Sequence, residues 1–243
     1  MHKLAAFDRI VILYSRRHSL WHSQANPLKL REQFKQSGLA ENVHLHRSPV
    51  DNNGHRGCWR GHKNIAKETL RLGYGSVSIF EEDAVLSDSF IKNWREMERA
   101  MDEIGGWDIF YLAHNPEQMQ VLEPRGIVSY GSIVKVKSWS TVAYTIRGAA
   151  LKRLAASTYS ELPSGTVDGV LHESNKAMSF YPMPVTHPDN WSRTVLQKRH
   201  LHWSVQEKIL YTFAQNCHSR TATFNDISLF VRGQGDIHCR AAF

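Results

Sequence analysis

Three acidic residues end an apolar stretch and are the side chains in this chain best suited to bind a cation. Residues 76–86 read Ser-Val-Ser-Ile-Phe-Glu-Glu-Asp-Ala-Val-Leu, so Glu81, Glu82 and Asp83 follow directly on a β-prone run. Ligands of open α/β sheets bind at the carboxyl ends of the strands. Because Mg²⁺ and Mn²⁺ take carboxylate and phosphate oxygens, the stretch predicts a site for a metal ion bound to a nucleotide diphosphate. A solvated turn between a strand and a helix is the alternative interpretation.

The elements around these acids alternate between strands and helices. Apolar and β-prone runs predict strands at residues 9–14, 43–47, 77–80, 108–112, 132–136, 141–146 and 179–183. Helical spacing predicts helices at residues 27–37, 65–72, about 88–104, 148–156 and 203–216. This alternation indicates a layered α/β fold around a mainly parallel sheet. The periodicity of residues 217–243 is too weak to place them.

Size and composition favour one compact, intracellular domain. The 243 residues, 42% of them hydrophobic, fit one large domain, and the longest apolar runs have the length of strands, so none would span a membrane. The N-terminal residues do not resemble a secretion signal. Cys58, Cys217 and Cys239 are odd in number and lack C-x-x-C spacing. We therefore expect reduced thiols in a cytoplasmic protein and no zinc cage.

The charge balance predicts an anionic partner. The chain has 30 basic and 23 acidic residues, a net charge of +7, and an isoelectric point near 9.4. From Arg125 to Arg153 there are six Lys or Arg and no acid, and a second basic stretch runs from Arg193 to His202. Nucleic acid, a membrane surface or a phosphorylated glycan would suit this charge, although solvated surface explains it equally well.

Two further segments combine with the acids into a recognisable order. Gly-Cys-Trp-Arg-Gly-His at 57–62 precedes the acidic strand, and Trp-Asp-Ile-Phe-Tyr-Leu at 107–112 and Ser-Thr-Val-Ala-Tyr-Thr-Ile at 140–146 follow it. In order and spacing, about residues 8–175 resemble glycosyltransferase family 25, which includes lipooligosaccharide galactosyltransferases. Two positions depart from the family pattern: Glu82 stands where the family has Asp, and Gly61 where it has Ser.

The resemblance implies a GT-A-like (Rossmann-like) fold in which residues 1–243 form a single domain, with residues 176–243 on the acceptor side. It also implies transfer of a sugar, such as galactose or glucose, from a nucleotide-sugar donor, expected to be a UDP-sugar, with Mn²⁺ or Mg²⁺ as cofactor. The expected acceptor is a hydroxyl of a lipooligosaccharide or lipopolysaccharide glycan. This acceptor would place the enzyme in the cytoplasm, at the inner face of the membrane.

The same resemblance assigns roles to residues of the donor and metal site. Asp83 is the expected direct metal ligand, with Glu81 or Glu82 orienting water or the ribose. GT-A enzymes often recruit a late histidine to the metal, and here the candidate is His187. Other residues expected to contact the donor are Arg16 and Arg17, which follow the first strand, and Gly57 and His62 at a helix start.

An inverting transfer also needs a base near the acceptor hydroxyl. Asp168, in Val-Asp-Gly-Val-Leu, matches a late aspartate of the family, and its alternative role is that of a helix N-cap. Glu173 is the second candidate for the base. The pairs His44/His46 and His200/His202 have no third ligand at a suitable spacing, so we interpret them as incidental.

Two other functions fit the same residues. The acceptor could be DNA with hydroxymethylated bases, as in viral DNA modification, because basic stretches can follow phosphates and aromatic residues can hold an extruded base. Trp59, Trp139, Trp191 and Trp203 are the candidates for that contact. The chain could also be a non-catalytic nucleic-acid-binding module that keeps the fold. Nucleophilic catalysis and a Walker loop find no support in the sequence.

Overall fold

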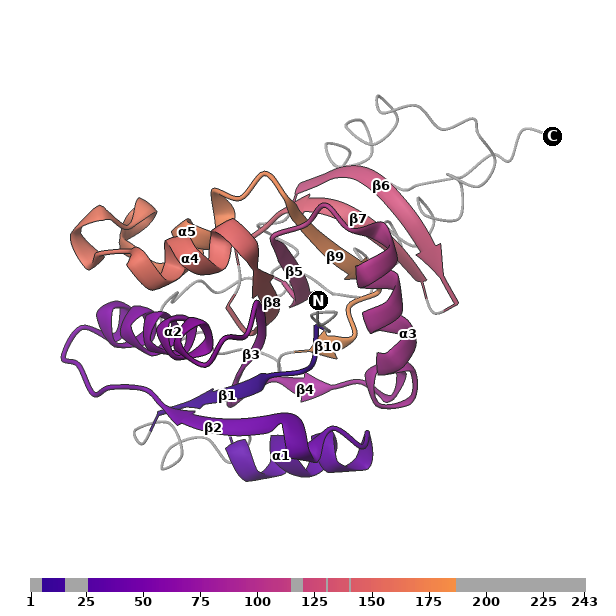
Figure 1. Cartoon of the computed structure of the whole chain (residues 1–243), viewed down its shortest axis with the longest axis horizontal. Coiled ribbons are helices and arrows are strands. Elements are labelled where there is room, and N and C mark those ends of the chain that lie inside the picture. The colour runs from indigo at the N-terminus through magenta and orange to yellow at the C-terminus, as the bar shows by residue number, and fades with distance from the viewer. Residues whose placement is uncertain (1–5, 16–25, 115–119, 130, 140, 187–243) are drawn as a thin grey trace, which may run out of the picture.

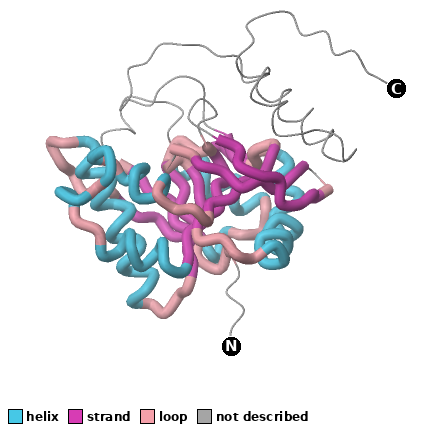
Figure 2. Tube along the Cα trace, turned by 90° about the horizontal axis from the view of Figure 1, so that it is seen from above, coloured by secondary structure: helices cyan, strands magenta, loops and turns pink. Residues whose placement is uncertain are grey.

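A computed structural model of the chain describes residues 6–15, 26–114, 120–129, 131–139 and 141–186. Most of its strands form one sheet that is covered by helices on both faces (Figures 1 and 2). The strands are β1 (Ile10–Tyr14), β2 (Val43–Arg47), β3 (Ser76–Glu81), β4 (Val85–Leu86), β5 (Ile109–Ala113), β6 (Gln120–Val128), β7 (Gly131–Lys137), β8 (Ala143–Arg147), β9 (Ala177–Tyr181) and β10 (Val185–Thr186). The helices are α1 (Pro27–Gln36), α2 (Gly54–Arg71), α3 (Asp88–Ile104), α4 (Gly148–Ala156) and α5 (Val167–His172).

The sheet is mixed, but most of its strands point in one direction. The order is β2-β1-β3-β8-β5-β9-β7-β6, and β4 pairs separately with β10. The pairs β1–β2, β1–β3 and β5–β9 are parallel, whereas β8 and β7 run antiparallel to their neighbours. Of the eight strands in the described sheet, only β7 and β8 therefore oppose the other six. This result confirms the predicted α/β fold with a mainly parallel sheet.

Each face of the sheet has its own apolar core. Alternate residues of β3 point to opposite faces, so Phe80 packs against α1 and α3 while Val77 and Ile79 face α2 and α4. On the α1 and α3 face, Phe34 and Phe90 meet Phe80 edge-on. These two cores fix the sheet and therefore the position of every strand end.

Local signals explain where the helices begin and end. The Ser87 hydroxyl accepts a hydrogen bond from Phe90 N and starts α3, and Gly105 with φ 54° stops it. The expected helix at residues 65–72 is longer than predicted, because α2 begins at Gly54, where the Asn53 side chain accepts from Arg56 N. The polar and glycine-rich composition of residues 54–64 hid this part of the helix.

Strand β6 has no counterpart among the predicted strands. Its sequence, Gln-Val-Leu-Glu-Pro-Arg-Gly-Ile-Val, contains a proline and a glycine that argue against a strand. Both are tolerated because β6 is at the edge of the sheet, where its pairing with β7 shifts register twice. The predicted helix at residues 203–216 lies outside the described residues. So do most of residues 176–243, which were predicted to form the acceptor side.

Candidate functional site

Three elements bring polar side chains to the carboxyl end of β3. Helix α2 runs toward the start of β3, so its first turns lie over the carboxyl ends of the strands. Helix α5 precedes β9 in the same way and packs against α2. The acids at the end of β3, the start of α2 and the start of α5 therefore lie on the same side of the sheet, at the carboxyl ends of its parallel strands.

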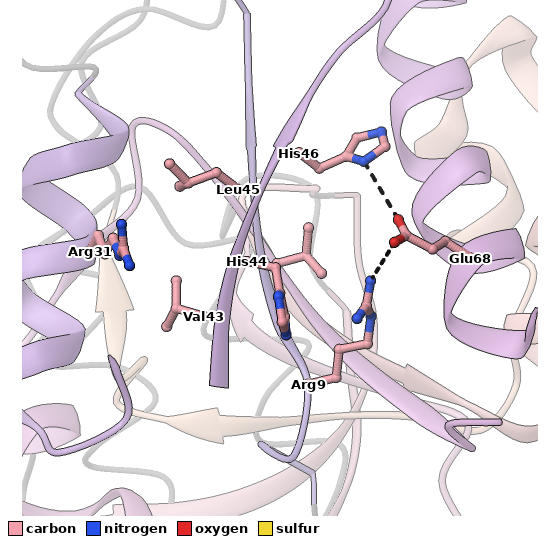
Figure 3. Close-up of a pocket in the computed structure, with 8 residues that line it drawn as sticks. Arg9, Arg31, Val43, His44, Leu45, His46 and Glu68 are labelled. Carbon is pink, nitrogen blue, oxygen red and sulfur yellow. Dashed lines mark ion pairs between the residues drawn. The ribbon is translucent and has the colours of Figure 1, made fainter. Parts of the chain in front are cut away.

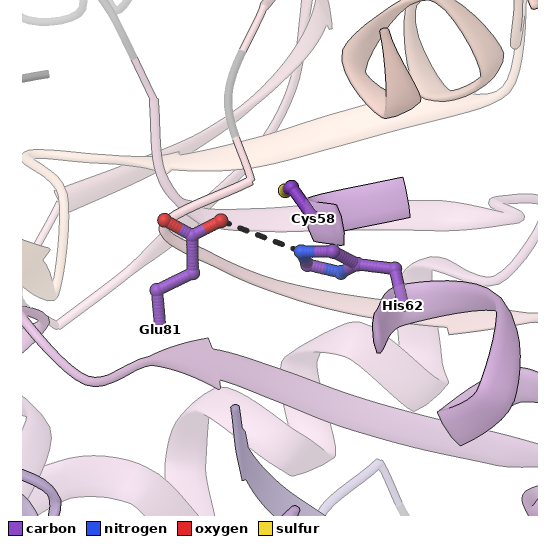
Figure 4. Close-up of side chains that lie close together, drawn as sticks. All are labelled: Cys58, His62 and Glu81. Atoms are coloured by element: carbon purple, nitrogen blue, oxygen red, sulfur yellow. Dashed lines mark hydrogen bonds and ion pairs between the residues drawn. The ribbon is translucent and has the colours of Figure 1, made fainter. Parts of the chain in front are cut away.

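A buried hydrogen-bond network fixes Glu81. The His62 side chain is 0% exposed, and its Nε2 lies 3.3 Å from Glu81 Oε1. Its Nδ1 lies 2.8 Å from the hydroxyl oxygen of Tyr144, whose ring stacks on the imidazole. Cys58, one turn earlier on α2, completes a group in which the thiol sulfur, an imidazole nitrogen and a carboxylate oxygen all lie within 4.8 Å of one another (Figure 4).

The next acid, Glu82, is more deeply buried than Glu81. Glu82 is 6% exposed and accepts a hydrogen bond from Ser15 N at 3.1 Å, which attaches the end of β1 to the acidic turn. Burial raises the pKa of Glu82 to about 7, and the charges of Asp83 and Glu81 add to this effect. The oxygen-rich donors and the crowding of negative charge both fit a hard divalent cation.

Asp168 faces the same group of acids. The cap of α5 is Thr166, whose hydroxyl accepts from Gly169 N, so the alternative role of Asp168 as the N-cap is wrong. Burial raises the pKa of Asp168 to about 6, and Glu81 raises it further while His62 opposes the shift. Asp168 can therefore exchange a proton close to neutral pH.

The Cys58 thiol is not an activated nucleophile. Burial raises its pKa, and the carboxylates of Glu81, Asp168 and Asp83 raise it further. The same polar edge contains the Tyr111 hydroxyl, which donates to Ser138 O at 3.0 Å. Burial likewise raises the pKa values of Tyr111 and Tyr144, so both hydroxyls stay protonated at neutral pH.

Several predicted site residues do not join the site as expected. Glu173 is exposed and follows the last turn of α5, in the segment that leads to β9. It therefore lies at the opposite end of α5 from Asp168, which is in the first turn. His62 is enclosed and cannot contact a donor directly, because its ring nitrogens already face Tyr144 and Glu81. The missing side chain of Gly57 leaves room for Pro49 and Asp51, both of which would lie 3.3 Å from an added Cβ. Gly57 therefore has a packing role, and its predicted donor contact stays a prediction.

The other predicted contacts lie outside the described residues, namely Arg16, Arg17 and His187. Conversely, the sequence did not single out Cys58 or Tyr144 as part of the site. The spacing of Cys58 and His62, four residues apart on one face of α2, was a usable signal. Tyr144 had no such signal, because only the pairing of β3 with β8 places it beside Ile79.

A second histidine is buried at the same edge of the sheet. His114 directly follows β5, is 3% exposed, and neither of its ring nitrogens has a hydrogen-bond partner among the described residues. Its backbone N–H points to Met183 Sδ at 3.2 Å. Burial lowers the pKa of His114 to about 3, so this ring is neutral in the folded protein.

The pair His44/His46 lies beside a cavity of about 400 Å³ along the edge strand β2 (Figure 3). Glu68 of α2 binds Arg9 at 3.4 Å and faces His46 Nδ1 at 3.9 Å. His44 is exposed, and burial and Arg9 lower its pKa. These contacts agree with the interpretation of the pair as incidental, because the carboxylate beside them already pairs with Arg9.

Known proteins resemble this chain in sequence over less than half of its length. It is 34% identical over 108 residues to "Probable inactive glycosyltransferase 25 family member 3" of Rattus norvegicus and 33% identical over 112 residues to the "Inactive glycosyltransferase 25 family member 3" of Homo sapiens. Each match covers 43% of this chain and 18% of the relative. The chain thus spans less than a fifth of the length of these curated relatives. No family model matches the chain.

Among solved structures, similar chains share little sequence with this one. Mannose-1-phosphate geranyltransferase from Thermus thermophilus has a TM-score of 0.44 and 14% identity over 79% of this chain and 80% of that chain. A glycosyltransferase involved in the glycosylation of the major capsid of PBCV-1 has a TM-score of 0.38 and 12% identity over 64% of this chain and 71% of that chain. Within the described residues, no helix is both long and apolar enough to cross a bilayer. The sequence relatives thus support the resemblance to glycosyltransferase family 25 over 43% of the chain.

Proposed function

We propose that this chain is a metal-dependent glycosyltransferase that moves a sugar from a nucleotide-sugar donor to an acceptor hydroxyl. The observation that carries this proposal is that Glu81 ends β3, Asp83 follows it, and Asp168 in the first turn of α5 lies close enough to Glu81 for that carboxylate to raise its pKa. Ligands of open α/β sheets bind at this edge. The sequence similarity to glycosyltransferase family 25 members supports the same class of reaction.

In this proposal the acidic turn holds Mn²⁺ or Mg²⁺. Asp83 would be the direct ligand, with Glu81 beside it, and a bound ion would neutralise the charge of the nucleoside diphosphate leaving group. His62 acts through Glu81 rather than on the donor, since its ring fixes the carboxylate between α2 and β3. Arg16 and Arg17, which follow β1 in the sequence, and Gly57 remain predicted donor contacts.

Asp168 is our candidate for the base in an inverting transfer. Its pKa of about 6 leaves the carboxylate ionised above that pH, where it can accept the proton of an acceptor hydroxyl. Glu173, the second candidate, follows the last turn of α5, so Asp168 in the first turn is the better placed of the two.

The proposed donor is a UDP-sugar, and the proposed acceptor is an anionic glycan such as lipooligosaccharide or lipopolysaccharide at the cytoplasmic face of a membrane. The net charge of +7 suits such an acceptor. A DNA acceptor suits it too, but two of the aromatic residues expected to hold a base are already engaged. Trp59 is 8% exposed and donates to Ser157 Oγ, and Trp139 stacks on His172. A gel shift with modified and unmodified duplex DNA at increasing salt separates the two acceptors.

A second candidate is a non-catalytic module with the same fold. The names of the sequence relatives favour it, because they describe inactive proteins. The departure of Glu82 from the family pattern favours it too. Calorimetry with a UDP-sugar and Mn²⁺ tests this candidate, since a module that binds only nucleic acid gives no heat with the nucleotide sugar.

The test of the proposed function is UDP-sugar hydrolysis or transfer with and without Mn²⁺, in the wild type, in Asp83→Ala and in Glu173→Gln. Activity should require the metal, collapse in Asp83→Ala and persist in Glu173→Gln, the matched control with an exposed carboxylate. Full activity in Asp83→Ala would rule out the proposed site.

A further inference from the structure

We propose that Cys58, His62 and Glu81 form a binding site for a thiophilic divalent cation, with Zn²⁺ as the best match. Their ligand atoms lie within 4.8 Å of one another (Figure 4). The site shares Glu81 with the oxygen-rich site proposed around Asp83, but its other two donors come from α2. The inference goes beyond the proposed function and does not depend on it, because it concerns binding of the metal alone.

The fold itself brings the three side chains together. Cys58 and His62 are four residues apart, so they lie on the same face of α2. Glu81 follows Val77 and Ile79 with the two-residue period of a strand, and this row of β3 faces the α2 side of the sheet. The last residue of the row is therefore a carboxylate directed at the first turns of α2.

The distance between the nitrogen and oxygen donors matches the needs of a tetrahedral ion, and the sulfur lies within 4.8 Å of both. Zn–N and Zn–O bonds of about 2.0–2.2 Å at tetrahedral angles place the nitrogen and oxygen about 3.3–3.5 Å apart. His62 Nε2 and Glu81 Oε1 are 3.3 Å apart. With the thiol as the third donor, the fourth position would remain for water or another oxygen, as in zinc sites that keep an open position.

The second nitrogen of His62 has the partner that a metal ligand needs. Nδ1 lies 2.8 Å from the Tyr144 hydroxyl oxygen, which can accept a hydrogen bond from a protonated Nδ1 and so leave Nε2 unprotonated for an ion. Tyr144 and His62 are both completely buried, so the position of the ring is fixed before any ion arrives, and an ion would replace the Nε2 proton that faces Glu81.

The donor set selects the class of cation. One thiolate, one imidazole and one carboxylate balance a 2+ charge, and thiolate ligands favour Zn²⁺ over Mg²⁺, Ca²⁺ and Mn²⁺. Binding releases the thiol proton. An ion here would link the start of α2 to the end of β3 and would add to the stability of the fold by mass action.

The test is a titration of the reduced chain of 243 residues with Zn²⁺, monitored by calorimetry and by thermal unfolding. A second titration uses Co²⁺ as a spectroscopic probe. We expect one equivalent of Zn²⁺ to bind and raise the Tm, and Co²⁺ to give a thiolate charge-transfer band. Cys58→Ser should lose that band and weaken Zn²⁺ binding more than about tenfold. Substitution of residues that only hydrogen-bond to metal ligands already causes a loss of about that size. Glu81→Gln, which keeps the shape of the side chain, should weaken binding comparably.

Cys217→Ser is the matched control, because it removes a different thiol and should bind Zn²⁺ like the wild type. Asp83→Asn should also keep Zn²⁺ binding, so the result stays readable if the transferase proposal fails. Equal Zn²⁺ affinity in the wild type, Cys58→Ser and Glu81→Gln would overturn the inference. Displacement of Zn²⁺ by a modest excess of Mg²⁺ would also overturn it.

Discussion

A buried histidine lies near the end of β3 and another near the end of β5. Within the described part of the chain, only the first of the two rings has hydrogen-bond partners. His62, over the end of β3, faces Tyr144 on one side and Glu81 on the other. His114, after β5, has no such partner for either ring nitrogen. Burial of a histidine therefore does not identify a functional site by itself. The carboxylate beside His62 does, because it connects the ring to the acids of the proposed donor site.

The largest expected effect of a substitution is on catalysis at the end of β3. Asp83→Asn removes a carboxylate at the proposed metal site, so we expect turnover to fall about 10²–10³-fold. His114→Leu, at the end of β5, should change turnover less than about twofold, because the His114 ring makes no hydrogen bond to the described acids. Steady-state rates with a UDP-sugar and Mn²⁺ measure both. A loss in His114→Leu that matched the loss in Asp83→Asn would remove the distinction between the two ends.

The next effect is on stability. His62→Leu leaves the buried Tyr144 hydroxyl and the partly exposed Glu81 carboxylate without their partner. We expect the free energy of unfolding to fall by about 2–4 kcal/mol. Urea unfolding followed by circular dichroism measures the change. Wild-type stability in this variant would mean that the network does not hold the end of β3 in place.

A smaller effect should follow from Tyr144→Phe. This change keeps the ring that stacks on His62 and removes only the hydroxyl that lies 2.8 Å from Nδ1. We expect a loss of about 1–2 kcal/mol, less than for His62→Leu, because Glu81 keeps its contact with the imidazole. The same unfolding measurement applies. A larger loss of stability than in His62→Leu would contradict the prediction that His62 contributes more to the network than the Tyr144 hydroxyl.

The smallest effect at neutral pH, and one of opposite sign, is expected for His114→Leu. The substitution removes two nitrogens that have no partner in the described structure and should stabilise the fold by about 1 kcal/mol at pH 7. The folded pKa of about 3 lies below the ordinary value of 6.5, so between these values the unfolded state binds more protons. The wild type should therefore lose stability as pH falls below 6.5, by at most about 1.4 kcal/mol per pH unit from this group.

His114→Leu should lack that contribution. Unfolding titrations of both proteins between pH 7 and pH 5 test this, and the stabilisation by leucine should grow as the pH falls. Parallel curves for the two proteins would show that His114 does not titrate as the structure indicates.

The sequence predicted the parts of this molecule that depend on local pattern. The apolar spacing of α3, from Phe90 to Ile104, and the unbroken apolar run of β1 predicted both elements within a residue or two. The periodic pattern predicted only residues 65–72 of α2, with Gly57 and His62 expected at a helix start, and strand β6 was not predicted. Polar, glycine and proline residues obscure the patterns of these segments. Tertiary packing and the edge position of β6, rather than propensity, decide these two elements.

The site was predictable only in part, for the same reason. The acids at 81–83 were visible because they adjoin a strand, and Glu81 lies close enough to Asp168 to raise its pKa. Glu173 lies after the last turn of α5, whereas Asp168 lies in the first turn, and a sequence does not show which end of a short helix faces the proposed site. The grouping of Cys58 with Glu81 depends on how α2 lies over β3, which no spacing along the chain reveals.

The most direct test of the central claim is a calorimetric titration of a UDP-sugar, in the presence of Mn²⁺, into the wild type and Asp83→Asn. Our account predicts saturable binding to the wild type that weakens at least about tenfold in the variant and in the absence of Mn²⁺. Binding of equal affinity to both proteins, or no binding to the wild type, would contradict it.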